Sequence, residues 1–234
     1  MSNDTYNYLT LLDNKIIIGN TIEDIWRDAI WCCVRNGYDY RIERGSYEGD
    51  KIRRQLDSLM IKVLTPWKRP LSVRLPESIP FSIVTEDYIE EYFMSKILSD
   101  EKSDNEDYTY GQFIMKQLDD VIGMLQNTKN TNQAVIEIGN GASIYFKDPP
   151  CLKLIDFKVI NNKLNLITYW RSWDLINGLP VNLGGMQLLK EYVLANVRDL
   201  EDGELICYSS GGHIYDHNFD LVNMLNVDKI KNNS

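Results

Sequence analysis

Cys151 is the residue of this sequence with the clearest potential for covalent chemistry, because it directly follows Pro149 and Pro150. Two successive prolines stiffen the backbone and cannot continue a helix, so they hold the cysteine at a fixed corner. A cysteine attacks an electrophile as the thiolate, which nearby positive charge stabilises. Cys151 is therefore a candidate nucleophile, with a buried structural thiol as the alternative.

Arg171 and Ser172 follow within the run YWRSWD. A guanidinium fork beside a hydroxyl suits a phosphate group, because arginine can bind it through two hydrogen bonds and serine can add a third. The alternative is an ordinary surface salt bridge between Arg171 and Asp174. These residues indicate a candidate anion site.

Three polar residues further along the chain suit a nucleoside. Asn182 offers both a donor and an acceptor to the edge of a pyrimidine, or else it caps a helix. His213 and Tyr215 alternate along an expected strand and so face the same side. They could bind sugar hydroxyls, or they could fill a polar core.

The elements that must position these residues are both helices and strands, which predicts an α+β fold. Thr21 is the expected N-cap of the first helix, which Asn36 and Gly37 end, and Asn161-Asn162 is an expected tight turn. We expect one domain over 1–234, with a mobile charged loop at about 99–107. The expected helices cover about 22–36, 86–98, 112–126 and 182–198, and the expected strands cover 58–65, 134–139, 153–160, 163–170, 204–208 and 213–215.

Composition narrows the function classes. The net charge of −9, from 25 basic and 34 acidic residues, disfavours a nucleic-acid partner. The spacing of the four cysteines and two histidines fits neither a zinc site nor a disulfide framework, so we expect no metal and reduced thiols in the cytoplasm. The N-terminal run MSNDTYNYL does not resemble a signal peptide, and no apolar stretch approaches 18 residues, so we expect no membrane partner.

The ordered runs PPC, RSWD, PVNLGGMQLL and GGHIY together resemble the thymidylate synthase family, most closely its shorter archaeal-type members. The resemblance is dense over about 148–220. Upstream, Arg44-Gly45-Ser46 resembles the family's mobile phosphate-binding loop, and Tyr108-Thr109-Tyr110-Gly111 resembles its YG segment. Glu91, or else Glu90, resembles its active-site glutamate.

The resemblance implies a role for each matching residue. Cys151 would attack C6 of a pyrimidine, while Arg171, Ser172 and Arg44 would bind its phosphate. Asn182 would read the O4 and N3 edge of uracil.

Two further roles complete the implied site. His213 and Tyr215 would hold the 3′-hydroxyl of the deoxyribose. Asp174 would contact the folate or order the site, and Glu91 would be catalytic.

The implied reaction adds a one-carbon unit from 5,10-methylenetetrahydrofolate to C5 of a dUMP-like nucleotide. Hydride transfer to the methylene would give thymidylate, whereas capture by water would give a hydroxymethyl nucleotide from dUMP or dCMP. A non-catalytic nucleotide-binding relative is the third hypothesis. The family fold implies a large mixed β-sheet with packed helices in three layers, and a homodimer formed through that sheet.

Three departures from the family pattern stand out. Thr131-Asn132-Gln133 lies where a tandem arginine pair is expected, and Leu152 stands where many members have histidine. The printed chain also ends about twenty residues after HIY, which leaves the expectation of a closed, dry site weaker.

Overall fold

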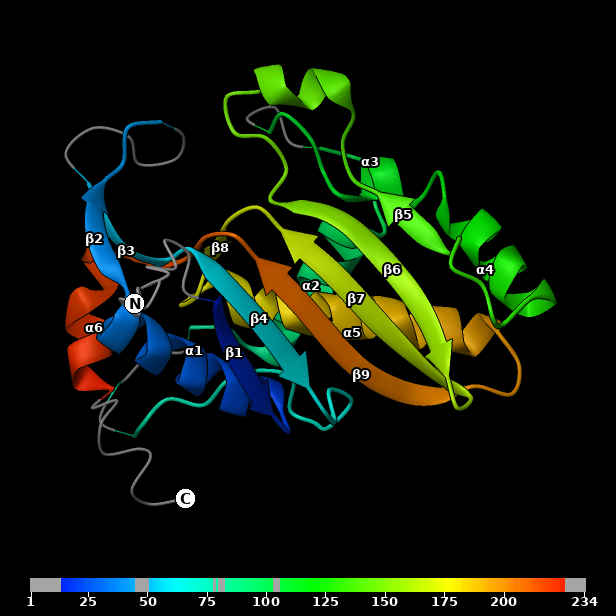
Figure 1. The fold of residues 1–234 in the computed structure, drawn as a ribbon, viewed down its shortest axis with the longest axis horizontal. Helices are drawn as coiled ribbons and strands as arrows, with labels where there is room; N and C mark the ends of the chain where they lie inside the picture. Colours follow the sequence, from blue (N-terminus) through cyan, green and yellow to red (C-terminus); the bar gives the residue numbers. More distant parts are fainter. Residues whose placement is uncertain (1–13, 45–50, 78, 80–82, 103–105, 226–234) are drawn as a thin grey trace, which may run out of the picture.

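The computed structural model describes residues 14–44, 51–77, 79, 83–102 and 106–225. Its larger sheet has six strands in the order β1-β4-β9-β7-β6-β5 (Figure 1). The pairs β1/β4 and β7/β9 are parallel and the other pairs are antiparallel, so the predicted large mixed sheet is confirmed. The strands are β1 (Asn14–Gly19), β4 (Ser58–Val63), β5 (Val135–Glu137), β6 (Leu152–Ile160), β7 (Lys163–Trp170) and β9 (Glu201–Ser209).

A second sheet of four strands has the order β2-β3-β10-β8. Only Ser210 and Gly211 separate β9 of the large sheet from β10 of the small one, so the chain passes directly between the sheets. The two sheets therefore meet where the motif residues of the sequence are concentrated. The strands are β2 (Tyr38–Arg41), β3 (Ile52–Leu56), β8 (Trp173–Asp174) and β10 (Gly212–Tyr215).

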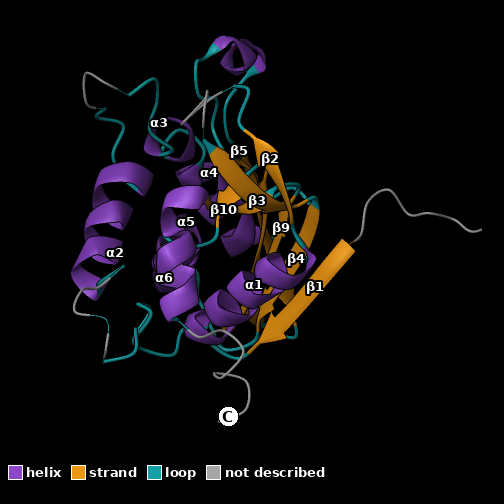
Figure 2. Cartoon of the chain, turned by 90° about the vertical axis from the view of Figure 1, so that its left-hand side faces the viewer, coloured by secondary structure: helices purple, strands orange, loops and turns teal. Residues whose placement is uncertain are grey.

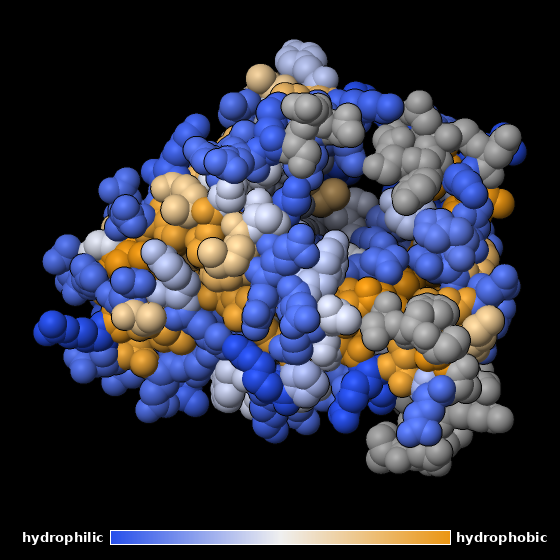
Figure 3. Space-filling view, turned by 180° about the vertical axis from the view of Figure 1, so that it is seen from behind, coloured by the Kyte–Doolittle hydropathy of each residue, from blue (hydrophilic) through white to orange (hydrophobic). Residues whose placement is uncertain are grey.

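Helices cover one side of the large sheet, and its other face is bare of helices among the described residues (Figure 2). From the sheet outward, α5 comes first and α2 lies beyond it, which matches the predicted three-layer arrangement. Seen from the helix side, hydrophobic areas are broken up by hydrophilic side chains (Figure 3). The helices are α1 (Ile22–Asn36), α2 (Glu86–Tyr92), α3 (Gly111–Ile114), α4 (Leu118–Asn127), α5 (Gly178–Asn196) and α6 (Phe219–Met224), with a π-helical segment at Phe93–Ile97 and 3-10 turns at Gly141–Tyr145 and Asp216–Asn218.

The first helix confirms the prediction made from its cap. The Thr21 hydroxyl accepts a hydrogen bond from the backbone N–H of Asp24, whose carboxylate accepts from the backbone N–H of Thr21. This capping box satisfies two donors that the first helical turn leaves unpaired. The apolar stripe of α1, including Cys33, is buried against the core.

The hairpin between β6 and β7 also follows the prediction. Asn161 and Asn162 have φ of 52° and 60°, the left-handed conformation that a two-residue hairpin turn requires and that asparagine tolerates. This turn fixes the register of β6 and β7 along their length. The ends of the two strands away from the turn therefore lie side by side, at Leu152 and Trp170.

Two helix predictions are wrong in detail. The helix expected to start at Asn182 begins at Gly178, so Pro180 lies in its first turn, where a backbone N–H has no partner to lose. Asn182 is inside α5 and caps nothing. The helix expected over 112–126 is divided into α3 and α4, and a Gln117 side chain bonds to the carbonyls of Phe113 and Glu137 at the break.

A glycine pair brings α2 close to α5. A Cβ at Gly184 would lie 2.7 Å from Ile89, and one at Gly185 would lie 2.9 Å from the Tyr92 ring. Only glycine permits this approach without a shift of the packed side chains. The consequence is that Tyr92 reaches the second turn of α5. None of the helices in the described ranges is long and apolar enough to cross a membrane.

Candidate active site

The nucleophile candidate and its arginine meet at the ends of β6 and β7. Leu152 is paired with Trp170, so Cys151 and Arg171 each stand one residue beyond the paired ends. The backbone N–H of Arg171 donates to the carbonyl of Cys151 at 2.8 Å. The strand register shifts between Leu152 and Leu154, a bulge of the kind that re-aims side chains at active sites. The hairpin thus brings two residues twenty positions apart into contact.

The Arg171 side chain is held beside the double proline. Its Nη2 donates to Asp148 Oδ1 at 2.8 Å and also to the carbonyl oxygen of Pro149. Its Nε is buried and has no partner among the described residues. A buried N–H without an acceptor is costly, so this atom points to a ligand that supplies an oxygen.

Cys151 differs from the other three cysteines, because it is half-buried while Cys32, Cys33 and Cys207 are buried. Burial raises the pKa of the Cys151 thiol, and the charge of Arg171 opposes this rise. For Cys33 and Cys207, burial raises the pKa of each thiol to about 12. Cys151 is thus the accessible thiol with cationic neighbours, which is the setting a nucleophilic cysteine requires.

His213 is buried at 2% exposure and its Nδ1 lies 3.0 Å from the carbonyl oxygen of Gly211. A carbonyl only accepts, so Nδ1 carries the proton. Burial lowers the pKa of His213 to about 4, so the ring is neutral and Nε2 is an acceptor. Nε2 is buried without a partner in the described part of the chain, so it is ready to accept from a hydroxyl.

Tyr215 and Ser172 flank His213. The Tyr215 ring stands edge-on to the imidazole with centroids 4.6 Å apart, which confirms that the two residues share one face of β10. Burial raises the pKa of Tyr215 to about 12, so its hydroxyl is protonated. Ser172 Oγ lies 3.4 Å from His213 Nδ1. His213, Tyr215 and Ser172 thus form a cluster of polar side chains, and Ser172 directly follows Arg171 in the chain.

Asn182 is held by two hydrogen bonds. Its Oδ1 accepts from Trp173 Nε1 at 2.9 Å, and its Nδ2 donates to the Tyr92 hydroxyl at 2.8 Å. Because an indole nitrogen can only donate, it fixes which end of the amide carries the oxygen. One Nδ2 proton remains to donate.

Asp174 shapes the entry to α5. Its Oδ1 accepts from the backbone N–H of Ile176 at 2.9 Å, and its Oδ2 accepts from Asn177 Nδ2 at 3.4 Å. Burial raises the pKa of the Asp174 carboxyl. Its observed contacts are with the turn before α5.

Glu91 and Arg44 stand apart from this group. Glu91 is exposed on α2, as is Glu90, while the next residue, Tyr92, is the one that contacts Asn182. Arg44 is exposed and lines a hollow of about 410 Å³ together with residues 40–43 and Arg53. The rest of its loop, 45–50, lies outside the described residues, as do residues 103–105 of the charged loop.

Three neighbours of the site carried no motif that predicted them. The position of Tyr92 depends on the close approach of α2 to the glycine pair of α5. Trp173 is the variable position of the RSWD motif. Arg53 lies in a polar stretch of sequence that forms β2 and β3. Tyr108 and Tyr110 of the YG segment do lie near Cys151. Burial raises the pKa of both phenols, and a negative charge on Cys151 would raise it further. For Tyr92 and Arg53 the available signal was only their residue type.

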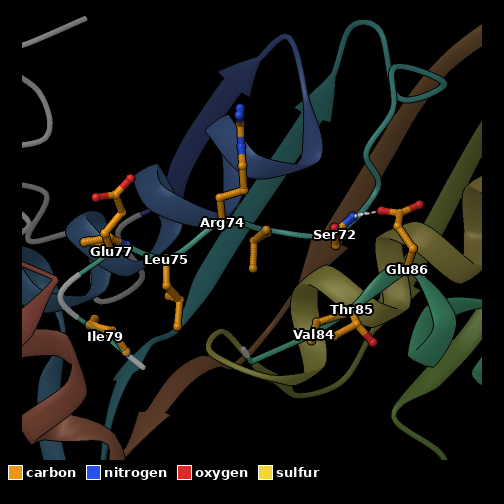
Figure 4. Close-up of a pocket in the computed structure, with 10 residues that line it drawn as sticks. Ser72, Arg74, Leu75, Glu77, Ile79, Val84, Thr85 and Glu86 are labelled. Atoms are coloured by element: carbon orange, nitrogen blue, oxygen red, sulfur yellow. Dashed lines mark hydrogen bonds between the residues drawn. The ribbon is translucent and has the colours of Figure 1, made fainter. Parts of the chain in front are cut away.

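A second hollow lies elsewhere, between residues 72–77 with Ile79 and the start of α2, with a volume of about 500 Å³ (Figure 4). The backbone N–H of Ser72 donates to Glu86 across it. Arg74, at its rim, pairs with Glu23 at 3.1 Å. None of the predicted site residues lines this hollow.

The architecture has a known counterpart. The structure of the thermostable thymidylate synthase A from Bacillus subtilis superposes with a TM-score of 0.65 at 17% identity, covering 88% of this chain and 84% of that one. The fold is therefore the α+β fold of the thymidylate synthases.

Sequence comparison identifies the family. The thymidylate synthase family model matches residues 85–231. A protein of Methanosarcina barkeri named "Putative thymidylate synthase" is 31% identical over 215 residues, covering 89% of this chain and 93% of its own. A protein of the same name from Methanothermobacter thermautotrophicus is 27% identical over 217 residues, covering 86% and 93%. The chain belongs to the thymidylate synthase family, as its motifs predicted.

Proposed function

We propose that this protein is a thymidylate synthase that converts dUMP to dTMP through a covalent adduct on Cys151. The observation that carries the proposal is the pairing of Cys151 with Arg171 at the ends of β6 and β7. Of the four cysteines, Cys151 alone is not buried, and it has a guanidinium for a neighbour. A nucleophile and an anion-binding group side by side suit an electrophilic nucleotide.

In the proposed first step the thiolate of Cys151 forms a bond to C6 of the uracil ring. The electrons of the C5–C6 double bond move onto C5 and O4, which makes C5 a carbon nucleophile. Methylenetetrahydrofolate, when bound, supplies the one-carbon unit and the reducing electrons. Loss of the C5 proton and release of the sulfur from C6 then restore the ring and the free cysteine.

Asn182 supports uracil as the base. With Oδ1 committed to Trp173, the amide presents its remaining N–H, which pairs with the O4 acceptor of uracil. Cytosine carries an amino donor at that position and would meet donor against donor. The orientation of this amide is the reason to favour dUMP over dCMP.

The sugar and phosphate have matching groups. His213 Nε2 is a buried acceptor that the 3′-hydroxyl can satisfy, with Tyr215 beside it. Arg171 Nε and Ser172 Oγ offer donors to the phosphate, and Arg44 is proposed to add positive charge from the hollow that it lines with Arg53. Nucleotide binding would thus satisfy two of the buried polar atoms that lack partners in the described residues.

Glu91 and Asp174 complete the proposed set. Glu91 is proposed as the catalytic carboxylate, which requires its exposed side chain on α2 to act on bound ligands. Asp174 is proposed to order the turn into α5 and to contact the folate. Glu91→Gln should lower turnover by more than tenfold, whereas the neighbouring Glu90→Gln should retain it.

The bare face of the large sheet is the proposed dimer interface. Strand pairing aligns Ile16, Met60, Tyr208, Tyr169 and Leu154 in one apolar row across five strands. Ile16 is 57% exposed and Tyr208 is 37% exposed. Apolar rows of this extent on an uncovered sheet suit a self-complementary contact. The cytoplasm is the proposed compartment, because Cys151 must stay reduced.

The proposal is tested by tritium release from [5-³H]dUMP in the presence of methylenetetrahydrofolate. Wild type and Cys33→Ala should release tritium, and Cys151→Ala should not. Production of dihydrofolate and of dTMP, identified by mass, supports the synthase, whereas a hydroxymethyl product would replace it with a hydroxymethylase. No release from labelled dUMP or dCMP would contradict both enzymes and leave a nucleotide-binding relative.

A further inference from the structure

Arg53 and Arg54 are consecutive on β3 and point to opposite sides of it. Arg54 pairs with Asp39 at 2.7 Å and lies over Phe219. Arg53 is half-buried, donates to the Tyr40 hydroxyl, and lies over the Tyr40 ring at 4.8 Å. Arg53 is paired across the small sheet with Tyr215, a residue of the sugar site. The two arginines therefore have different partners although they are neighbours on one strand.

Arg53 on β3 and Arg171, which directly follows β7, both interact electrostatically with His213 and Cys151. Burial lowers the pKa of His213 and raises that of Cys151, and in both residues the positive charges of Arg53 and Arg171 act to lower the pKa. Both guanidinium groups are therefore within electrostatic reach of His213 and Cys151. Burial lowers the pKa of Arg53, and the like charge of Arg171 lowers it further. Two cations brought together at a half-buried site are stabilised when an anion lies between them.

The surroundings of Arg53 leave room for that anion. Arg53 lines the hollow of about 410 Å³ that Arg41, Glu43 and Arg44 also line. A guanidinium carries five N–H donors, and Tyr40 and Tyr215 take up some of them. Across the site, Arg171 Nε is a buried donor without a partner among the described residues. Arg171 therefore retains a donor for an anionic ligand.

We infer that Arg53 binds the phosphate monoester of the nucleotide together with Arg171 and Ser172, a role that rests on the proposed function. Through Tyr215 it also ties the phosphate end of the site to the sugar end. All of these residues come from one chain. The site would therefore hold a phosphate without positive charge at Thr131–Gln133.

The test compares dUMP with deoxyuridine, which differ by the phosphate. Dissociation constants are measured by calorimetry for wild type, Arg53→Gln and Arg53→Lys, with Arg54→Gln as the matched control. Arg53→Gln should weaken dUMP binding by about 10-fold to 100-fold and change deoxyuridine binding by less than about twofold. Arg53→Lys should recover part of the loss, and Arg54→Gln should bind dUMP like wild type.

Several results would overturn the inference. If Arg53→Gln binds dUMP like wild type, Arg53 does not touch the phosphate. If Arg53→Gln weakens the binding of dUMP and of deoxyuridine equally, Arg53 only positions Tyr215 and Tyr40. An equal loss in Arg54→Gln would indicate a general effect on β3.

Tritium release at saturating dUMP separates this inference from the proposed function. Wild type that binds dUMP through Arg53 but releases no tritium would contradict the function and leave the phosphate contact standing. Release by Arg53→Gln with an unchanged KM would contradict the phosphate contact alone.

Discussion

The Nε1 atom of Trp173 donates a hydrogen bond to Oδ1 of Asn182 at 2.9 Å. This bond fixes the position of the amide oxygen and so the direction in which the remaining amide N–H points. Trp173 is buried at 2% exposure and stacks on Trp170 with ring centroids 5.0 Å apart. The hydrogen bond therefore has a rigid donor. Because the amide cannot turn over without losing this hydrogen bond, Trp173 fixes which atoms of the Asn182 amide are left to contact a ligand.

Trp173→Phe should reduce the preference for dUMP over dCMP. Phenylalanine keeps the ring stacking but removes the donor, so Asn182 can present its oxygen to the cytosine amino group. The ratio of kcat/KM for the two nucleotides should fall about tenfold, the worth of one hydrogen bond. Trp170→Phe is the control, since its Nε1 donates to Thr168 instead at 2.8 Å. An unchanged ratio in Trp173→Phe, or an equal fall in both variants, would exclude this role.

Asp148→Asn should make the Cys151 thiol more reactive. The Asp148 carboxylate raises the pKa of Cys151, and it also occupies Nη2 of Arg171. Without its charge the thiol pKa should fall, so alkylation by iodoacetamide at pH 8 should become roughly twofold to fivefold faster. Asp120→Asn, on the exposed side of α4, should leave the rate unchanged. A slower reaction in Asp148→Asn would mean that Asp148 positions Arg171 for the thiolate.

His213 should make stability depend on pH between about 6.5 and 4. The pKa of His213 is about 4 in the folded protein, below its ordinary value of 6.5, so the unfolded chain binds more protons in this window. The free energy of unfolding should therefore fall as the pH falls, by at most about 3 kcal/mol from this residue. With the free energy of unfolding measured by urea at several pH values, its slope against pH should be shallower for His213→Gln than for wild type. Parallel slopes for wild type and His213→Gln would contradict the buried neutral ring.

Ile206→Lys should weaken the proposed dimer. Ile206 lies on β9 beside Ile167 of β7, on the bare face of the large sheet. A lysine there would have to be desolvated in a sheet-to-sheet contact. Sedimentation should show wild type as a dimer and Ile206→Lys shifted toward monomer. Met94→Lys is the control, because the Met94 side chain is 61% exposed near α2, and this variant should remain a dimer. A monomeric wild type would remove the interface from this face.

The parts of the site that the sequence could predict are those set by local order. Cys151 and Arg171 come together because Asn161-Asn162 fixes a short hairpin, and His213 and Tyr215 share a face because strand side chains alternate. These signals span a few residues to about twenty, which is the range over which sequence patterns are informative.

The remaining contacts depend on pairings distant in the chain. Arg53 meets Tyr215 across 162 positions through β3 and β10, and Tyr92 meets Asn182 through the packing of α2 on α5. Asn182 also fits a helix N-cap in the sequence, because proline is common near a helix start, but α5 begins one turn earlier at Gly178. No local pattern encodes such contacts.

The most direct test of the account is the mass of a trapped adduct. With 5-fluoro-dUMP and methylenetetrahydrofolate, fluorine at C5 cannot leave as a cation, so the bond between the enzyme and C6 of the base should persist. Intact-mass and peptide analysis should then show one nucleotide on the peptide that contains Cys151 and none on peptides containing Cys33 or Cys207. A modified residue other than Cys151, or turnover of dUMP by Cys151→Ala, would contradict the assignment of Cys151 as the nucleophile.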